Sequence, residues 1–170
     1  MIRHAGLVAA RIGGRWTGAL IEGPSGSGKS DLALRAIGEG LVLVADDRTR
    51  VFVSRNQLFG APPRPLAGLM EARGVGILAR GALPLARIGL RVRCVDRPDA
   101  VTRLPDPAVE PLLGVPVPVI DLWPFEASAP LKLILALRHL GVSPQEAYQA
   151  RFAPPQGGGG RRGLPVGLKT

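Results

Sequence analysis

The hydrophobic positions of this chain fall mostly into short segments that are separated by glycine, proline and aspartate. Apolar segments at 7–12 and 16–22 flank Gly13-Gly14-Arg15, a pattern that predicts a β-hairpin. Residues 41–45, Leu-Val-Leu-Val-Ala, form a continuous apolar run, which is typical of a strand buried on both faces. The first part of the chain is therefore predicted to be rich in strands.

Further strands are predicted downstream. The segments 50–54 and 58–59, on either side of Asn56-Gln57, suggest a second hairpin. Single strands are expected at 90–95 and 115–120. The stretch Pro98–Pro111 is rich in proline and is predicted to be irregular.

Two helices are predicted between these strands. Residues 30–39 carry apolar side chains with helical spacing, and Gly40 supplies a stop. A second helix is expected to begin after Ser128 as N-cap, with Pro130 in its first turn, and to run to about Leu140.

The C-terminal part of the sequence changes in character. Ser143-Pro144-Gln145-Glu146 is a capping box and predicts a short last helix. From Pro154 onward the chain is low in complexity and too poor in apolar residues to pack a core. We therefore predict one folded domain over residues 1–153 and a basic, disordered tail over 154–170.

Composition narrows the class of protein. The chain has 170 residues and 46% hydrophobic residues, which fits one globular domain. No apolar run approaches the roughly 20 residues that a membrane span needs. Cys94 is the only cysteine, so an intrachain disulfide and a thiolate metal cluster are excluded. These features predict a cytoplasmic protein that does not bind membranes.

The formal net charge of +9 raises the alternative of a nucleic-acid-binding protein. The arginines are scattered along the chain, and aromatic residues make up only 4% of it, too few for base-stacking platforms. We therefore do not predict nucleic acid as a partner. A biased amino-acid usage explains the charge, and attraction to nucleotide phosphates or to an acidic partner protein is the functional alternative.

Residues 23–30 carry the strongest chemical signal. Their sequence, Gly-Pro-Ser-Gly-Ser-Gly-Lys-Ser, matches the phosphate-binding pattern G-x-x-x-x-G-K-[ST] at every fixed position. Glycines let main-chain N–H groups wrap a polyphosphate, Lys29 can reach the β/γ-phosphates, and the Ser30 hydroxyl can sit on Mg²⁺. The alternative is a glycine-rich turn that only joins strand to helix. The predicted nucleotide-binding residues are Gly23, Pro24, Ser25, Gly26, Ser27, Gly28, Lys29 and Ser30.

Asp46 and Asp47 follow the apolar strand 41–45. In open α/β sheets, ligands bind beyond the carboxyl ends of strands. One carboxylate there can hold the water shell of the metal ion, and its neighbour can take a proton from an acceptor hydroxyl. Because neighbouring residues of a strand point to opposite sides, two separate roles are predicted; the alternative is a simple turn or cap.

Three motifs in order resemble HPr kinase/phosphorylase, the bacterial enzyme that phosphorylates a serine of the phosphocarrier protein HPr. They are the glycine loop continued by Asp-Leu-Ala-Leu, the segment Leu-Val-Ala-Asp-Asp ending at Asp47, and Met-Glu-Ala-Arg-Gly-Val-Gly-Ile ending at Ile77. The resemblance covers roughly residues 2–140. It implies an α/β fold: a P-loop kinase domain with a mixed β-sheet, β-hairpins and flanking helices.

The resemblance also implies roles for single residues. Lys29 would stabilise the transferring phosphate, and Asp47 would accept the serine proton. Ser30 and Glu71, with Asp46, would hold Mg²⁺. His4 resembles the active-site histidine that lies upstream of the loop, although the spacing is longer here, and a frayed terminal residue is the alternative. Arg73 would face phosphate or the partner, unless it forms a surface ion pair with Glu71.

The predicted function is thus an ATP- and Mg²⁺-dependent serine kinase acting on HPr or a related carrier, in regulation of the phosphotransferase system and carbon metabolism. The family implies a hexamer. Its full-length members carry a separate N-terminal domain, so this chain resembles a short form. Their Arg-Pro-Gly-Arg-Asn loop is replaced here by residues 125–132, which favours kinase activity over phosphorolysis. The alternatives are a small-molecule P-loop kinase and a non-catalytic nucleotide-sensing module.

Overall fold

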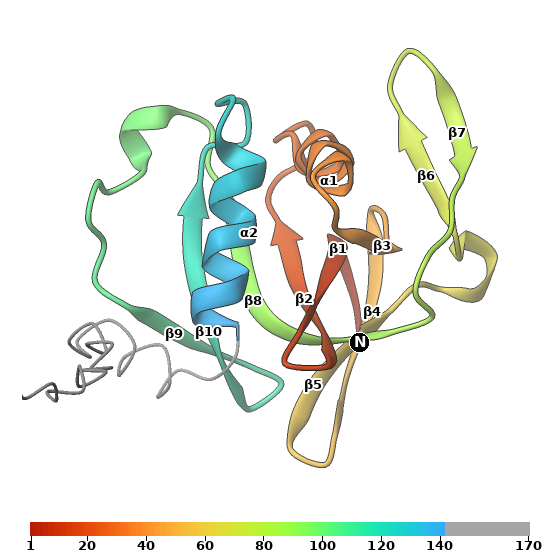
Figure 1. Cartoon of the computed structure of the whole chain (residues 1–170), viewed down its shortest axis with the longest axis horizontal. Helices are drawn as coiled ribbons and strands as arrows, with labels where there is room; N and C mark the ends of the chain where they lie inside the picture. The colour runs from red at the N-terminus through yellow and green to blue at the C-terminus, as the bar shows by residue number, and fades with distance from the viewer. Residues whose placement is uncertain (142–170) are drawn as a thin grey trace, which may run out of the picture.

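Ten strands and two α-helices make up residues 1–141, the part of the chain that this computed structural model describes (Figure 1). Along the chain the elements are β1 (Ile2–Ile12), β2 (Arg15–Glu22), α1 (Lys29–Gly38), β3 (Val42–Ala45), β4 (Arg48–Ser54), β5 (Gln57–Ala61), β6 (Leu69–Ala72), β7 (Gly76–Ala79), β8 (Ala86–Cys94), β9 (Ala108–Leu112), β10 (Val115–Leu122) and α2 (Ala129–Leu140). Single 3₁₀ turns lie at Arg64–Leu66 and Pro98–Ala100.

The main sheet has eight strands in the order β2-β1-β4-β5-β8-β10-β9, with β3 paired to β1. Strand β2 also pairs with β8, so β2, β1, β4, β5 and β8 form a closed, barrel-like path. The sheet is mixed because β8 runs parallel to both β2 and β10, while the other pairings are antiparallel. The predicted α/β class with a mixed sheet and hairpins is therefore confirmed.

Two hydrophobic clusters lie on opposite faces of this sheet. One fills the space within the closed path and includes Leu7, Val51 and Leu58. Its strands approach closely at Gly60, where an added Cβ would clash with Leu7. The other cluster lies beneath α1 and α2, which contribute Leu32 and Leu133 and which Figure 1 shows side by side over the sheet. Amphipathic helices thus cover one face of the sheet.

Strand directions bring several strand ends to the same edge. Because β2, β8 and β10 are parallel, their carboxyl ends lie together. Strand β3 has the direction of β2, since both are antiparallel to β1. The segments that follow these strands, including the glycine loop after β2 and the Asp46-Asp47 pair after β3, therefore gather at this edge.

The prediction of an irregular segment is wrong over its last four residues. The stretch Pro98–Pro111 was expected to be irregular, but Ala108–Leu112 forms β9, an edge strand antiparallel to β10. Pro111 is tolerated there because an edge strand leaves one side of its backbone unpaired. The proline in this segment is therefore explained by the position of β9 at the edge of the sheet, not by the absence of a strand.

The start of α2 also differs in detail from the prediction. Ser128 occupies the N-cap position and its carbonyl accepts from the Lys132 N–H at 2.9 Å, but its side chain makes no cap hydrogen bond. Its backbone is already helical, with φ −81° and ψ −4°, and this conformation does not direct the hydroxyl to the first free N–H groups as a capping residue does. Helix α2 is instead held by burial of its apolar side, which includes Leu133 and Leu137.

Arginines of the sheet are used in a ladder of ion pairs. The Arg91 guanidinium lies 2.7 Å from Glu22 and 3.2 Å from Glu110, and that of Arg93 lies 2.8 Å from Glu110 and 2.7 Å from Asp121. The pKa of Arg93 is raised, chiefly by its hydrogen bond to Asp121. Part of the positive charge is thus neutralised within the sheet, which weakens the nucleic-acid interpretation.

The predicted capping box at 143–146 and the predicted tail at 154–170 lie outside the described residues. Within residues 1–141, neither helix has the length and apolar character that would let it cross a membrane.

Candidate functional site

The glycine loop lies between the end of β2 and the first turn of α1. Gly26 and Gly28 have φ values of 78° and 85°, in the left-handed region that favours glycine. The Ser27 N–H donates to the Pro24 carbonyl at 3.2 Å and closes a turn within the loop. The sequence therefore has glycine where this backbone requires it, directly before a helix whose free N–H groups and dipole favour anions.

Lys29 is the first residue of α1 and is only 6% exposed. Its Nζ donates to the carbonyls of Gly23 at 3.0 Å and Pro24 at 2.7 Å. The ammonium group is therefore held inside the loop by main-chain oxygens, and a phosphate oxygen is the kind of partner that could replace them.

Ser30 and Asp46 are in direct contact. The Ser30 hydroxyl donates to Asp46 Oδ1 at 2.9 Å, and Asp46 Oδ2 accepts from the Glu71 N–H at 3.0 Å. Asp46 is 8% exposed, so this carboxylate is a buried link between Ser30, the segment after β3 and strand β6. Both of its oxygens have a partner, as buried charges require.

Asp47 lies in a different environment. Its Oδ1 is 2.5 Å from Nε2 of His4, and the side chains of the two residues are 55% and 51% exposed. The backbone of Asp47 is left-handed, with φ 60°, and β3 has already ended at Ala45. The two aspartates do differ in their surroundings, but a turn causes this, so the expectation of strand alternation was wrong.

His4 reaches the site because β1 is long. The register of the first hairpin pairs Ala5 with Glu22, so the start of β1 lies beside the carboxyl end of β2. His4 is also paired with Arg48 of β4, and the N-terminal ammonium group donates to the Val51 carbonyl at 2.8 Å. The alternative of a frayed terminus therefore does not hold, and the hairpin accounts for the longer spacing to the loop.

Glu71 and Arg73 belong to the hairpin of β6 and β7, a separate two-stranded sheet that projects from the body of the domain in Figure 1. Met70 is buried and anchors the hairpin, whereas both charged side chains are exposed. In the described residues no ion pair involves either of them, so the alternative of a surface ion pair between the two is not seen. The structure brings the Glu71 backbone to Asp46 but leaves its carboxylate free to meet a ligand.

Side-chain oxygens of Ser30 and Asp46 are the hard donors that suit Mg²⁺. Among residues 1–141 no group of three His, Cys, Asp or Glu side chains is arranged to hold a metal ion. Mg²⁺ is usually held through one or two protein oxygens, substrate phosphates and water.

A feature that sequence reasoning missed is the contact between the loop after β10 and the glycine loop. A Cβ placed on Gly28 would lie 3.0 Å from both Phe125 Cζ and Pro124 Cγ. Arg35 of α1 donates to the carbonyls of Pro124 and of Glu126, the latter at 3.3 Å. The contact depends on β2 and β10 ending at the same sheet edge, a long-range pairing for which the sequence gives no local signal.

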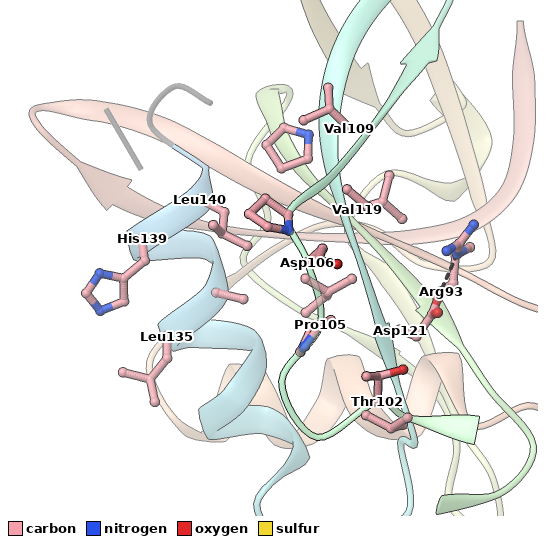
Figure 2. Close-up of a pocket in the computed structure, with 16 residues that line it drawn as sticks. Arg93, Thr102, Pro105, Asp106, Val109, Val119, Asp121, Leu135, His139 and Leu140 are labelled. Atoms are coloured by element: carbon pink, nitrogen blue, oxygen red, sulfur yellow. Dashed lines mark hydrogen bonds and ion pairs between the residues drawn. The ribbon is translucent and has the colours of Figure 1, made fainter. Parts of the chain in front are cut away.

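A cavity among the described residues lies away from this site. It has a volume of about 630 Å³ and is bounded by β10, α2 and the segment 101–109 (Figure 2). Its lining is mostly apolar, with the Arg93–Asp121 pair at one side. It shares no residue with the glycine loop or with the pair Asp46 and Asp47. The size of this cavity does not by itself indicate a reaction, whereas the side chains around the glycine loop can bind and transfer charged groups.

Comparison with known proteins agrees with this geometry. Residues 5–82 match the family model of the HPr Serine kinase C-terminal domain. Two curated relatives from Limosilactobacillus reuteri, strain DSM 20016 and subspecies reuteri strain JCM 1112, are both HPr kinase/phosphorylases. Each is 48% identical over 62 residues, which cover 36% of this chain. The matched part spans 19% of the length of either relative.

Among solved structures, the chain is similar to the Hpr(Ser) kinase/phosphatase from Coxiella burnetii, with a TM-score of 0.71 and 27% sequence identity. The match covers 89% of this chain and 96% of that one. The similarity therefore extends beyond the three motifs to the arrangement of the elements that carry them.

Proposed function

This chain belongs to the HPr kinase/phosphorylase family, and on that premise we propose that it transfers the γ-phosphoryl group of ATP to a serine hydroxyl of HPr or a related carrier protein. The observation that carries the proposal is the hydrogen bond of 2.9 Å between Ser30 of the glycine loop and Asp46, with Asp47 next in the chain. It places the glycine loop and the exposed carboxylate of Asp47 within one site.

In the proposed reaction the phosphates of ATP bind the main-chain N–H groups of residues 23–30. Lys29 exchanges its carbonyl partners for phosphate oxygens and stabilises the charge of the transferring group. Ser30 and Asp46, with Glu71 as a further oxygen donor, would hold a magnesium ion, which would supply positive charge at the phosphates. Residues of the loop thereby orient the donor.

Asp47 then acts as general base. Its carboxylate takes the proton of the seryl hydroxyl as the seryl oxygen forms a bond to the γ-phosphorus. The bond between that phosphorus and the bridging oxygen of the β-phosphate breaks, and ADP leaves. His4, 2.5 Å from Asp47 Oδ1, orients this carboxylate. Arg73 contributes positive charge from the neighbouring hairpin.

The exposure of Asp47 favours a protein acceptor over a small metabolite. A side chain that is 55% exposed can meet a serine on the surface of another protein. Small-molecule sites, by contrast, usually enclose most of the ligand surface. The proposed setting is cytoplasmic, and hexamer formation is proposed from the family.

The test is phosphotransfer from ATP and Mg²⁺ to HPr of the same organism, with mass spectrometry of the product. The wild type is expected to place one phosphoryl group on one serine, and Lys29→Ala is expected to lose both ATP affinity and transfer. Transfer to a metabolite panel instead of HPr would point to a small-molecule kinase. ATP binding without transfer to either would point to a sensing module.

A further inference from the structure

The loop between β10 and α2, residues 123–128, lies at the same sheet edge as the glycine loop. Figure 1 shows the two loops at the same end of the sheet, and Phe125 and Pro124 contact Gly28 from across this edge. Gly28 immediately precedes Lys29 and Ser30. A group placed on the 123–128 loop is therefore next to whatever the phosphate loop binds.

Phe125 is 55% exposed although its ring lies beside this site. Trp123 is half-buried and meets it edge to face, with ring centroids 6.3 Å apart. One part of the Phe125 ring thus rests on Gly28 and Trp123, while more than half of the residue faces solvent. An exposed aromatic surface of this kind is what a planar ligand stacks on.

The loop that carries the ring is fixed from two sides. Arg35 of α1 donates to the carbonyls of Pro124 and Glu126 and is itself oriented by Asp31, 2.8 Å away. On the other side, Lys132 of α2 lies 2.6 Å from the Glu126 carboxylate. The Phe125 ring is therefore held in position before any ligand binds, which lowers the entropic cost of stacking a ligand on it.

We propose that Phe125, supported by Trp123, is the platform on which the nucleobase of the bound nucleotide stacks. The inference rests on the proposed function, because it takes the phosphates of that nucleotide to occupy residues 23–30. Stacking on a phenyl ring does not depend on the hydrogen-bonding groups of the base, so ATP and GTP should bind with similar affinity. The platform makes the site prefer a nucleoside triphosphate over inorganic polyphosphate.

The test measures the affinity of the whole chain for three probes by calorimetry in the presence of Mg²⁺: ATP, GTP and inorganic tripolyphosphate. Phe125→Ala is expected to weaken ATP and GTP binding by about tenfold, within the range found for loss of base–aromatic stacking. Its affinity for tripolyphosphate should stay within about twofold of the wild type, because the phosphate loop is unchanged.

Two further variants make the result specific. Phe125→Tyr keeps the ring and should keep wild-type ATP affinity. Phe52→Ala removes an aromatic ring from β4, where Phe52 stacks on Phe59 with centroids 6.0 Å apart, and should leave all three affinities unchanged. Circular dichroism melts establish that each variant is folded.

Unchanged ATP affinity in Phe125→Ala would overturn the inference, and so would an equal loss of tripolyphosphate affinity, which would mean that the ring only supports the loop. Unchanged ATP affinity with weakened phosphotransfer to HPr would assign the ring to the protein acceptor. Failure of the proposed function looks different. If the wild type binds ATP more tightly than tripolyphosphate but phosphorylates no protein, the stacking role of Phe125 is supported and the proposed kinase function is contradicted.

Discussion

The candidate site has a buried half and an exposed half, and neighbouring aspartates separate them. Asp46 is 8% exposed and uses both oxygens inside the protein, whereas the side chain of Asp47 is 55% exposed and, within residues 1–141, is paired only with His4. A single left-handed residue at the end of β3 produces the difference. Identical side chains thereby acquire a structural role at Asp46 and, as proposed, a chemical role at Asp47.

The largest effect on activity is expected in the exposed half. Asp47→Asn removes the proposed base, and loss of such a group typically costs roughly 10²- to 10⁴-fold in rate. Asparagine tolerates the left-handed backbone, so the melting temperature and ATP affinity should stay unchanged. The measurement is the initial rate of phosphotransfer to HPr at fixed enzyme concentration.

A matched control for this variant is Glu39→Gln, which removes an exposed carboxylate at the end of α1, away from the end of β3. It should leave the rate unchanged. If Asp47→Asn transferred phosphate at the wild-type rate, Asp47 would not be the base and the exposed half of the site would lose its role.

The next effect concerns stability and belongs to the buried half. Asp46→Ala leaves the Ser30 hydroxyl and the Glu71 N–H without their acceptor, and an unsatisfied buried group costs about 1–3 kcal/mol. We expect the free energy of unfolding in urea to fall by about that amount. Asp46→Asn can still accept from one group and donate to the other, so it should recover most of the loss.

The same urea titration on Asp47→Asn sharpens the contrast, because changes at exposed positions usually stay within about 0.5 kcal/mol. A loss for Asp47→Asn as large as that for Asp46→Ala would contradict the division of the site into a buried and an exposed half.

Local signals made much of this structure predictable. The glycine loop, helices α1 and α2 and the hairpin of β1 and β2 follow from residue types within short windows, and the structure has them close to the expected bounds. The resemblance placed Asp47 and His4 in one site, and the register of β1 explains how a residue 19 positions before Gly23 lies near it.

Long-range geometry was not predictable. The pairing of β2 with β8 closes the barrel-like path over about 70 positions of sequence, and nothing local indicates it. The left-handed Asp47 follows from the turn into β4, not from the aspartate itself. The contact of Phe125 with Gly28 depends on which strand ends share an edge, so this part of the site emerged only from the coordinates.

The smallest effect on function is expected at Cys94, which lies beneath the buried half: its Cβ would be 3.0 Å from a Cβ on Gly23. Burial raises the pKa of the thiol to about 11, although the charge of Lys29 opposes the shift. The folded state therefore holds the proton more tightly than the unfolded state, whose thiol has a pKa of about 8.5. Stability is unaffected below that pH and falls as the pH rises toward 11.

Alkylation by iodoacetamide should reveal this directly. At pH 8 the native thiol should react at least about a hundredfold more slowly than the thiol in urea. The thiolate is the reacting species, the raised pKa leaves little of it in the folded protein, and burial also limits access of the reagent. Cys94→Ala should phosphorylate HPr at a rate within about twofold of the wild type. Rapid native alkylation at pH 8 would mean that the wall beneath the glycine loop opens, and Lys29 and Asp46 could then no longer be regarded as a rigid, buried support for the exposed base.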